Sequence, residues 1–144
     1  MPTRRATAMW EGGLRGGKGT FKGESTAIGG QYSFSSRFEE GVGSNPEELL
    51  AAAEAACFSM ALSGNLEKNG TPPTSIETTA ACTVGPKPGG GSRISTMAVE
   101  TVVVAPGLDD AKLQEISKET IEGCPVSQAF KGNLELSVKA TLKS

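Results

Sequence analysis

The chain has 144 residues, a formal net charge of −2 and no histidine. A chain of this length suits one compact domain, which we expect to span residues 1–144. The balanced charge, with no basic patch interleaved with aromatic residues, excludes the usual pattern of a nucleic-acid-binding protein. The missing imidazoles exclude histidine as a catalytic base or a metal ligand.

The sequence also shows no sign of export or of membrane insertion. The N-terminal residues lack the apolar segment of a secretory signal, and we find no run of roughly 18 apolar residues. We therefore expect a cytoplasmic protein that does not enter a membrane. The three cysteines are widely spaced and form no CxxC motif, so we expect neither a disulfide scaffold, nor a bound metal, nor another cofactor.

The first third of the chain is expected to be β structure interrupted by glycine. A strand is expected around Met9, followed by a glycine-rich turn. Residues 32–38 alternate between aromatic and polar side chains, which predicts a further strand with one buried face. In that strand Arg37 would point away from the aromatic side.

The clearest helix signal begins at residue 45. Asn45 fits the N-cap, Pro46 fits the first helical position, and Glu48 stands three residues after the cap. An alanine-rich run without proline then continues to about Asn69, and Gly70 can end it. Such a helix would be roughly 36 Å long. Because its first four turns are apolar nearly all round, we expect it to be central and buried.

The sequence also predicts the elements that follow the long helix. We expect two strands at 76–84 and 94–104, joined by a loop rich in glycine and proline. A helix is expected at 108–123, a short helix from 125 and a final strand at 134–142. The order of elements predicts an α+β fold in which antiparallel sheets wrap around the long central helix.

Two cysteines lie where thiol chemistry is expected. A thiol attacks as its thiolate. Cys124 lies between a helix stop and Pro125, at an N-cap where free backbone N–H groups favour a thiolate. Cys57 lies about three turns inside the long helix, so we expect a cation from elsewhere, with Arg37 as the candidate. A plain core position is the competing interpretation for any cysteine in an apolar segment, and Cys82 fits it.

Several motifs occur in a characteristic order: RFEEG at 37–41, NPEEL at 45–49, AACFSMAL at 55–62 and GCPVS at 123–127, with shorter matches at 10–12, 17–20 and 142–144. In this order and spacing they resemble the osmotically inducible protein C (OsmC) family, within the OsmC/Ohr superfamily of thiol-dependent peroxidases. The resemblance covers almost the whole chain.

The resemblance implies an intertwined homodimer that reduces organic hydroperoxides, and hydrogen peroxide less well, in defence against oxidative and osmotic stress. It implies that Cys57 attacks the peroxide and becomes a sulfenic acid, and that Cys124 resolves this acid as a disulfide. An external dithiol, for which a lipoyl-type dithiol is a candidate, would then reduce the disulfide. Arg37 would stabilise the Cys57 thiolate with Glu47 as its carboxylate partner, and Arg15 is the second candidate for the arginine.

Helix geometry adds a constraint to this site. Glu47 and Cys57 are ten residues apart on one helix, about 15 Å along its axis. We therefore expect Arg37 and Glu47 of one subunit to complete the cysteine site of the other. The family commonly has histidine three residues before the first cysteine, where this chain has Glu54. A charged carboxylate on that helix face would raise the thiol pKa, unless it pairs with a cation or faces away.

Two other functions stay open. The first is a thiol–disulfide exchanger acting on proteins, against which the absence of CxxC counts. The second is a non-enzymatic module that binds a small ligand or a partner and uses its cysteines only for packing.

Overall fold

The computed structural model describes residues 1–143, so the expected match at Ser144 lies outside the described residues. The chain divides into an N-terminal unit, Met1–Leu49, and a C-terminal unit that begins at Leu50. The long helix begins in the last residues of the first unit and continues through the second. A single domain over residues 1–144 stays a prediction.

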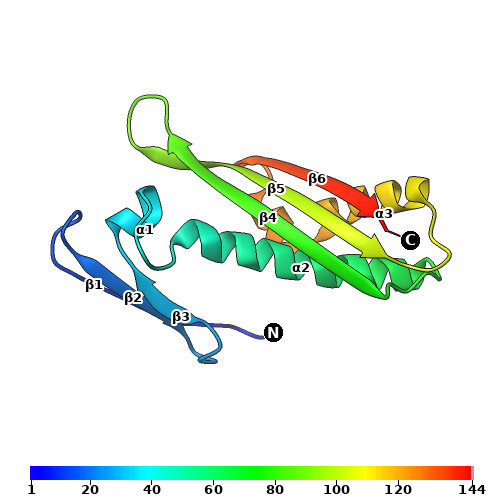
Figure 1. The fold of residues 1–144 in the computed structure, drawn as a ribbon, viewed down its shortest axis with the longest axis horizontal. Coiled ribbons are helices and arrows are strands. Elements are labelled where there is room, and N and C mark those ends of the chain that lie inside the picture. The colour runs from blue at the N-terminus through cyan, green and yellow to red at the C-terminus, as the bar shows by residue number, and fades with distance from the viewer. Residues whose placement is uncertain (144) are drawn as a thin grey trace. The chain divides into compact units, whose positions relative to one another are not determined.

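The N-terminal unit contains a meander of three antiparallel strands, in the order β1-β2-β3 (Figure 1). Their bounds are β1 Ala6–Glu11, β2 Lys18–Gly23 and β3 Gly29–Tyr32. Gly19 of β2 lies opposite Tyr32 of β3, and a Cβ added at Gly19 would lie 2.4 Å from the Tyr32 ring. Glycine therefore allows the aromatic ring to lie flat on the neighbouring strand.

The strand predicted for residues 32–38 ends at Tyr32, and a short helix α1, Phe34–Phe38, takes its place. The prediction was wrong because a local capping box outweighs the alternating pattern. The Ser33 hydroxyl accepts the Ser36 N–H, and the Ser36 hydroxyl accepts the Ser33 N–H. The rings of Phe34 and Phe38, four residues apart, lie 5.1 Å from each other. This i,i+4 spacing was the helical signal in the sequence.

The long helix α2, Pro46–Lys68, begins as predicted. The Asn45 side chain accepts the Glu48 N–H at 2.8 Å, which confirms the N-cap. In the single chain, however, α2 is buried along one face only, whereas burial nearly all round was expected. Small residues and Met60 are exposed on its other side, and Met60 alone is 79% exposed.

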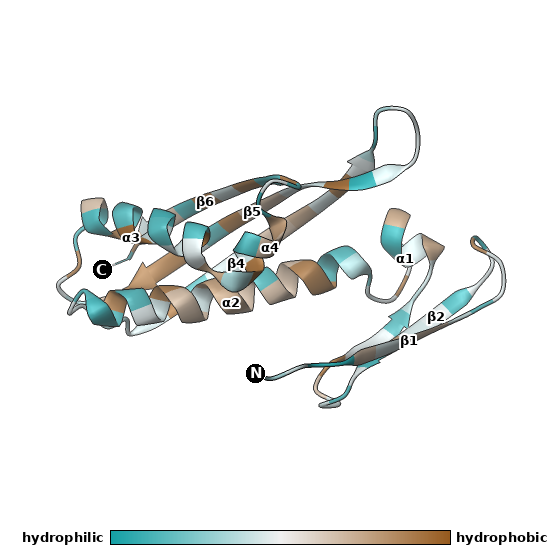
Figure 2. Cartoon of the chain, turned by 180° about the vertical axis from the view of Figure 1, so that it is seen from behind, coloured by the Kyte–Doolittle hydropathy of each residue, from teal (hydrophilic) through white to brown (hydrophobic). Residues whose placement is uncertain are grey.

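By length and composition alone, α2 is also long and apolar enough to cross a membrane. Its residues Phe58, Leu62 and Leu66 are fully buried, however. They belong to one hydrophobic core with Met97 and Val99, which lie on a strand of the C-terminal unit. This packing is that of a core helix, and Figure 2 shows the apolar residues along α2 and along the strands of the C-terminal unit.

The C-terminal unit has a sheet in the order β4-β5-β6 (Figure 1). Along the chain, the helices α3 and α4 follow β5 and precede β6. The bounds are β4 Ser75–Pro86, β5 Ser92–Val104, α3 Asp110–Gly123, α4 Pro125–Phe130 and β6 Glu135–Leu142. β4 and β5 pair antiparallel as expected, but β6 departs from the antiparallel expectation and pairs parallel to β5. A parallel pair needs a crossover, and α3 with α4 provides it.

Helix α3 packs on this sheet through the face that its sequence pattern indicates. The Asp109 side chain accepts the Lys112 N–H at 2.8 Å and caps the helix. Leu113 and Ile116 are buried in the core, while the outer positions are hydrophilic (Figure 2). The crossover thus fixes the junction between α3 and α4, where Cys124 lies.

Candidate active site

Two thiols from distant parts of the sequence are in contact in the C-terminal unit. The Sγ atom of Cys124 donates a hydrogen bond to Sγ of Cys57 at 2.9 Å, across 67 residues of sequence. Cys124 is 1% exposed, whereas Cys57 is only half-buried. The contact brings together the two cysteines that the sequence singled out. The third, Cys82, packs partly buried against the core, as expected.

The position of Cys124 follows from the two helices that meet there. Its backbone N–H donates to the Thr120 carbonyl at 2.8 Å, and its carbonyl accepts the Gln128 N–H at 2.9 Å. Cys124 is therefore the C-cap of α3 and the N-cap of α4, and Pro125 opens α4 as predicted. Its side chain makes no capping hydrogen bond, so the sulfur is available to Cys57.

Within this unit, Cys57 favours its neutral form. Burial raises the pKa of the Cys57 thiol above its ordinary value, and the neighbouring Cys124 thiol and Glu54 carboxyl act in the same direction. The backbone N–H of Val126, in the first turn of α4, donates to Cys57 and opposes this rise in pKa. A cation from outside this cluster is therefore needed if Cys57 is to react as a thiolate at neutral pH.

Glu54 lies one turn before Cys57 and is completely buried. Its Oε1 atom accepts a hydrogen bond from the Ser127 hydroxyl at 2.5 Å, and its Oε2 atom has no hydrogen-bond partner within residues 1–143. Burial raises the pKa of the Glu54 carboxyl, and the Ser127 hydrogen bond only partly opposes this. The partner of Glu54 is thus a hydroxyl in place of the cation considered from the sequence. Because protonation removes the negative charge, the raised pKa of Glu54 lessens the effect of this carboxyl on Cys57.

The raised pKa of Glu54 predicts how stability depends on pH. Folded chains hold the Glu54 proton more tightly than unfolded chains, so unfolding releases a proton when the pH lies between the usual 4.5 and the raised folded pKa. Wild type should therefore lose stability relative to Glu54→Gln, which cannot titrate, as the pH rises from 4.5. Urea unfolding of both proteins over a pH series measures this. A stability difference that stays constant above pH 4.5 would contradict the raised pKa of Glu54.

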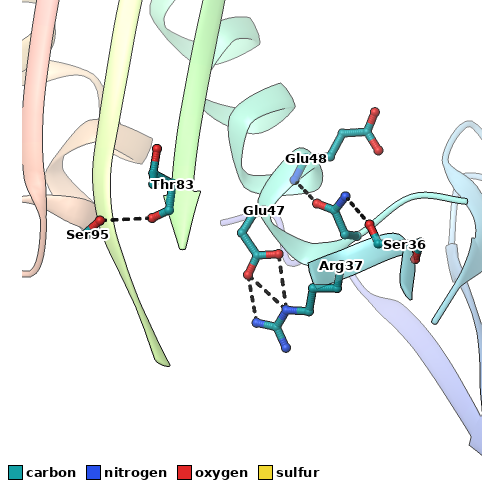
Figure 3. Close-up of polar contacts among 7 residues, drawn as sticks. Ser36, Arg37, Glu47, Glu48, Thr83 and Ser95 are labelled. Carbon is teal, nitrogen blue, oxygen red and sulfur yellow. Dashed lines mark hydrogen bonds and ion pairs between the residues drawn. The ribbon is translucent and has the colours of Figure 1, made fainter. Parts of the chain in front are cut away.

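In the N-terminal unit, Arg37 and Glu47 form an ion pair with two-pronged geometry (Figure 3). Nη2 of Arg37 donates to Oε1 of Glu47 at 2.8 Å, and Nε donates to Oε1 at 3.2 Å and to Oε2 at 3.3 Å. Glu47 is 6% exposed, while the Arg37 side chain is 37% exposed. The carboxylate therefore orients the guanidinium and leaves one edge of it accessible.

Arg37 also borders an apolar pocket of about 250 Å³. The pocket is lined mainly by aromatic and aliphatic residues: Trp10, Leu14, Tyr32, Phe34, Phe38 and Pro46. The Arg37 guanidinium lies 5.0 Å from the centre of the Phe38 ring, so it does not point away from the aromatic side as expected. Arg15, the second candidate, lies over Phe34 at 4.5 Å from the ring centre. The apolar lining of this pocket was not predicted, because helix α1 was taken for a strand.

The four candidate site residues thus form two pairs. The C-terminal unit brings Cys57 and Cys124 together, and the N-terminal unit brings Arg37 and Glu47 together. Along α2, Glu47 and Cys57 stay ten residues apart, a rise of about 15 Å. The catalytic roles of these four residues stay predictions. Sequence reasoning missed the contact of Ser127 with Glu54, although Ser127 is three residues after Cys124 just as Glu54 is three residues before Cys57.

Comparisons with known proteins identify the family to which the chain is similar. Residues 39–139 match the model of a family described as OsmC-like protein. The chain is 44% identical over 134 residues to peroxiredoxin OsmC of Escherichia coli (strain K12), and this alignment covers 92% of this chain and 93% of that protein. It is 32% identical over 99 residues to an organic hydroperoxide resistance protein of Xanthomonas axonopodis pv. citri (strain 306), covering 68% of this chain and 67% of that one.

The fold is shared as well. A solved structure of an organic hydroperoxide resistance protein from Elizabethkingia anophelis matches with a TM-score of 0.80 at 24% identity, covering 99% of this chain and 98% of that chain. This likeness confirms the expected α+β fold, which has a long helix and two small sheets. Because the family match includes both segments whose cysteines are in contact, and the relatives match most of the chain, this protein belongs to the OsmC-like family.

Proposed function

We propose that this protein reduces organic hydroperoxides with the Cys57–Cys124 pair as its reactive centre, in defence against oxidative and osmotic stress. The enzyme class follows from the family: relatives at 44% and 32% identity are a peroxiredoxin and an organic hydroperoxide resistance protein, and this protein is a peroxidase of the same family. The observation that supports the cysteine roles most directly is the 2.9 Å contact between two thiols that lie 67 residues apart in sequence.

The first step forms a sulfenic acid on the more exposed sulfur. The Cys57 thiolate attacks the outer peroxide oxygen, an S–O bond forms, the O–O bond breaks, and the leaving alkoxide takes a proton to become an alcohol. Cys57 is oxidised and the hydroperoxide is reduced by two electrons.

In the second step, Cys124 attacks the Cys57 sulfur as its thiolate. An S–S bond forms, the S–O bond breaks, and hydroxide leaves and takes a proton to become water. An external dithiol then reduces the disulfide and is itself oxidised to a disulfide, so the cycle needs no bound cofactor. We propose a dithiol of the lipoyl type, in a cytoplasmic setting.

The cation that Cys57 needs is proposed to come from a second copy of the chain. The Arg37 guanidinium is held by a buried carboxylate and keeps an accessible edge, which suits it to face a thiolate. The exposed, small-residue side of α2 would be covered in a homodimer, and helices pack closely where small residues face each other. This arrangement makes the site incomplete in a single chain.

The pocket beside Arg37 supports a preference for organic hydroperoxides. Its lining is mostly apolar, so binding there would transfer the alkyl group of an organic hydroperoxide out of water. Hydrogen peroxide has no alkyl group and would gain no binding free energy from this pocket. With a dithiol as reductant, we expect kcat/KM for cumene hydroperoxide to exceed that for hydrogen peroxide by at least about tenfold, the effect of burying roughly two methylene groups. Equal values would contradict the preference. No turnover of either peroxide with several dithiols would favour the binding module.

A further inference from the structure

Two cross-links join α2 to the start of α4, and they are spaced alike on both helices. Cys57 contacts Cys124, and Glu54, three residues earlier on α2, contacts Ser127, three residues later in the chain than Cys124. Residues three apart on a helix share a face. The carboxyl–hydroxyl contact therefore lies one turn from the thiol contact and connects the same two elements.

The first turn of α4 needs such a contact to stay in place. α4 has only six residues, and helices much shorter than about 12 residues depend on tertiary contacts. Ser127 is 0% exposed and Glu54 is 0% exposed, so water cannot replace either partner. The hydrogen bond between them, at 2.5 Å, is short and fully enclosed.

The same turn of α4 supplies both groups that act on Cys57. Cys124 is its N-cap and offers the resolving thiol, and the Val126 N–H donates to the Cys57 sulfur. We propose that Glu54 is a positioning residue: through Ser127 it holds the first turn of α4 so that Cys124 and the Val126 N–H both face Cys57. This inference builds on the proposed peroxidase function, and Glu54 itself need not touch the substrate.

The enclosed carboxyl suits this task for a chemical reason. In its protonated form, which burial favours, the Glu54 carboxyl accepts the Ser127 hydrogen bond without placing a negative charge beside the Cys57 thiolate. The buried Oε2 atom of Glu54 has no hydrogen-bond partner in the described part of the chain, so Oε1 makes the contact that holds Ser127. Glutamine keeps the Oε1 acceptor and the shape of the side chain, so it should replace Glu54 in the positioning role.

The test measures disulfide formation with diamide, so that it does not depend on peroxidase activity. Diamide takes two electrons and two protons from the Cys57 and Cys124 thiols, which become a disulfide while its N=N bond is reduced to a hydrazine. We expect Ser127→Ala and Glu54→Met to slow the formation of the intramolecular disulfide by about tenfold, the effect of losing one enclosed hydrogen bond. Glu54→Gln should form it at nearly the wild-type rate.

Ser117→Ala is the matched control. Ser117 is 1% exposed on α3, and its hydroxyl has no hydrogen-bond partner among the residues that the structure describes. Ser117→Ala therefore removes the same hydroxyl oxygen as Ser127→Ala without breaking a hydrogen bond. Unchanged rates in Ser127→Ala, equal slowing in Ser117→Ala, or slowing in Glu54→Gln as large as in Glu54→Met would each overturn the proposal.

A second readout separates positioning from general loosening of the fold. In a Cys124→Ser background, the Cys57 thiolate is titrated by its ultraviolet absorbance. Because the Val126 N–H lowers the pKa of Cys57, adding Ser127→Ala should raise that pKa, and adding Ser117→Ala should leave it unchanged. An unchanged pKa with Ser127→Ala would overturn the part of the proposal that concerns Val126. Normal diamide results in a wild type that does not turn over hydroperoxides would reject the peroxidase function alone.

Discussion

Replacing Cys57 with serine should abolish hydroperoxide turnover. A serine hydroxyl in this place has no nearby base to activate it, because the chain has no histidine and Glu54 already accepts the Ser127 hydroxyl. The loss should be complete within detection in a coupled assay with cumene hydroperoxide and a dithiol. Residual turnover at even a few per cent of the wild-type rate would mean that another group attacks the peroxide.

Cys124→Ser distinguishes the two sulfurs in the same assay. Its Cys57 should still react once, and the sulfenic acid should persist because no thiol lies within reach to resolve it. A sulfenate-specific trap followed by mass spectrometry would find about one label per chain on Cys57. Cys82→Ser is the control, since Cys82 packs against the core and has no assigned role. Labelling of Cys82 in place of Cys57 would contradict the assignment.

Arg37→Ala should lower kcat/KM strongly but, unlike the two cysteine variants, should still turn over. An opposite charge beside a thiol shifts its pKa by about one to three units, so at neutral pH the thiolate, and with it kcat/KM, should fall about tenfold to a thousandfold. Activity should recover partly at high pH, where the thiol ionises without help. Arg15→Ala is the matched control: both arginines stack on a phenylalanine of α1, but only Arg37 pairs with a buried carboxylate.

Mixing the inactive variant Cys57→Ser with the impaired variant Arg37→Ala tests whether the site is shared between subunits. In a mixed dimer of Arg37→Ala and Cys57→Ser, a shared site joins the intact Cys57 of one chain with the intact Arg37 of the other. Unfolding and refolding an equal mixture should therefore restore about a quarter of wild-type activity, since half the dimers are mixed and each has one complete site. No recovery, with mixed dimers present by native mass spectrometry, would place both residues of a site on one chain.

Much of this fold could be predicted because local signals agreed with the tertiary structure. The Asn45 cap and Pro46 fixed the start of α2, and Gly123 and Pro125 fixed the junction that holds Cys124. Both kinds of signal come from a few neighbouring residues, so they are readable without knowledge of the fold. The two cysteines could be singled out for the same reason.

The errors arose where neighbours in space decide the outcome. Serine and phenylalanine in residues 33–38 fit a strand and a helix equally well by pattern, and hydrogen bonds of Ser36 with Ser33 and with the Ser44 carbonyl decide for the helix. The parallel pairing of β6 depends on where the crossover of α3 and α4 returns the chain. The partner of Glu54 lies 73 residues away, and the equal spacing of Glu54 and Ser127 from the two cysteines indicates their contact only once the cysteines are known to meet.

The unequal exposure of the two sulfurs has a consequence for the direction of reduction. Once the disulfide has formed, an incoming thiolate must approach one sulfur in line with the S–S bond, and access decides which sulfur it attacks. Cys124 is 1% exposed, whereas Cys57 is only half-buried. The reductant is therefore expected to form its mixed disulfide with Cys57 and to release Cys124 as the leaving thiolate, which mass spectrometry of a trapped adduct would locate. One sulfur would then meet both the oxidant and the reductant, and the other would serve only inside the protein.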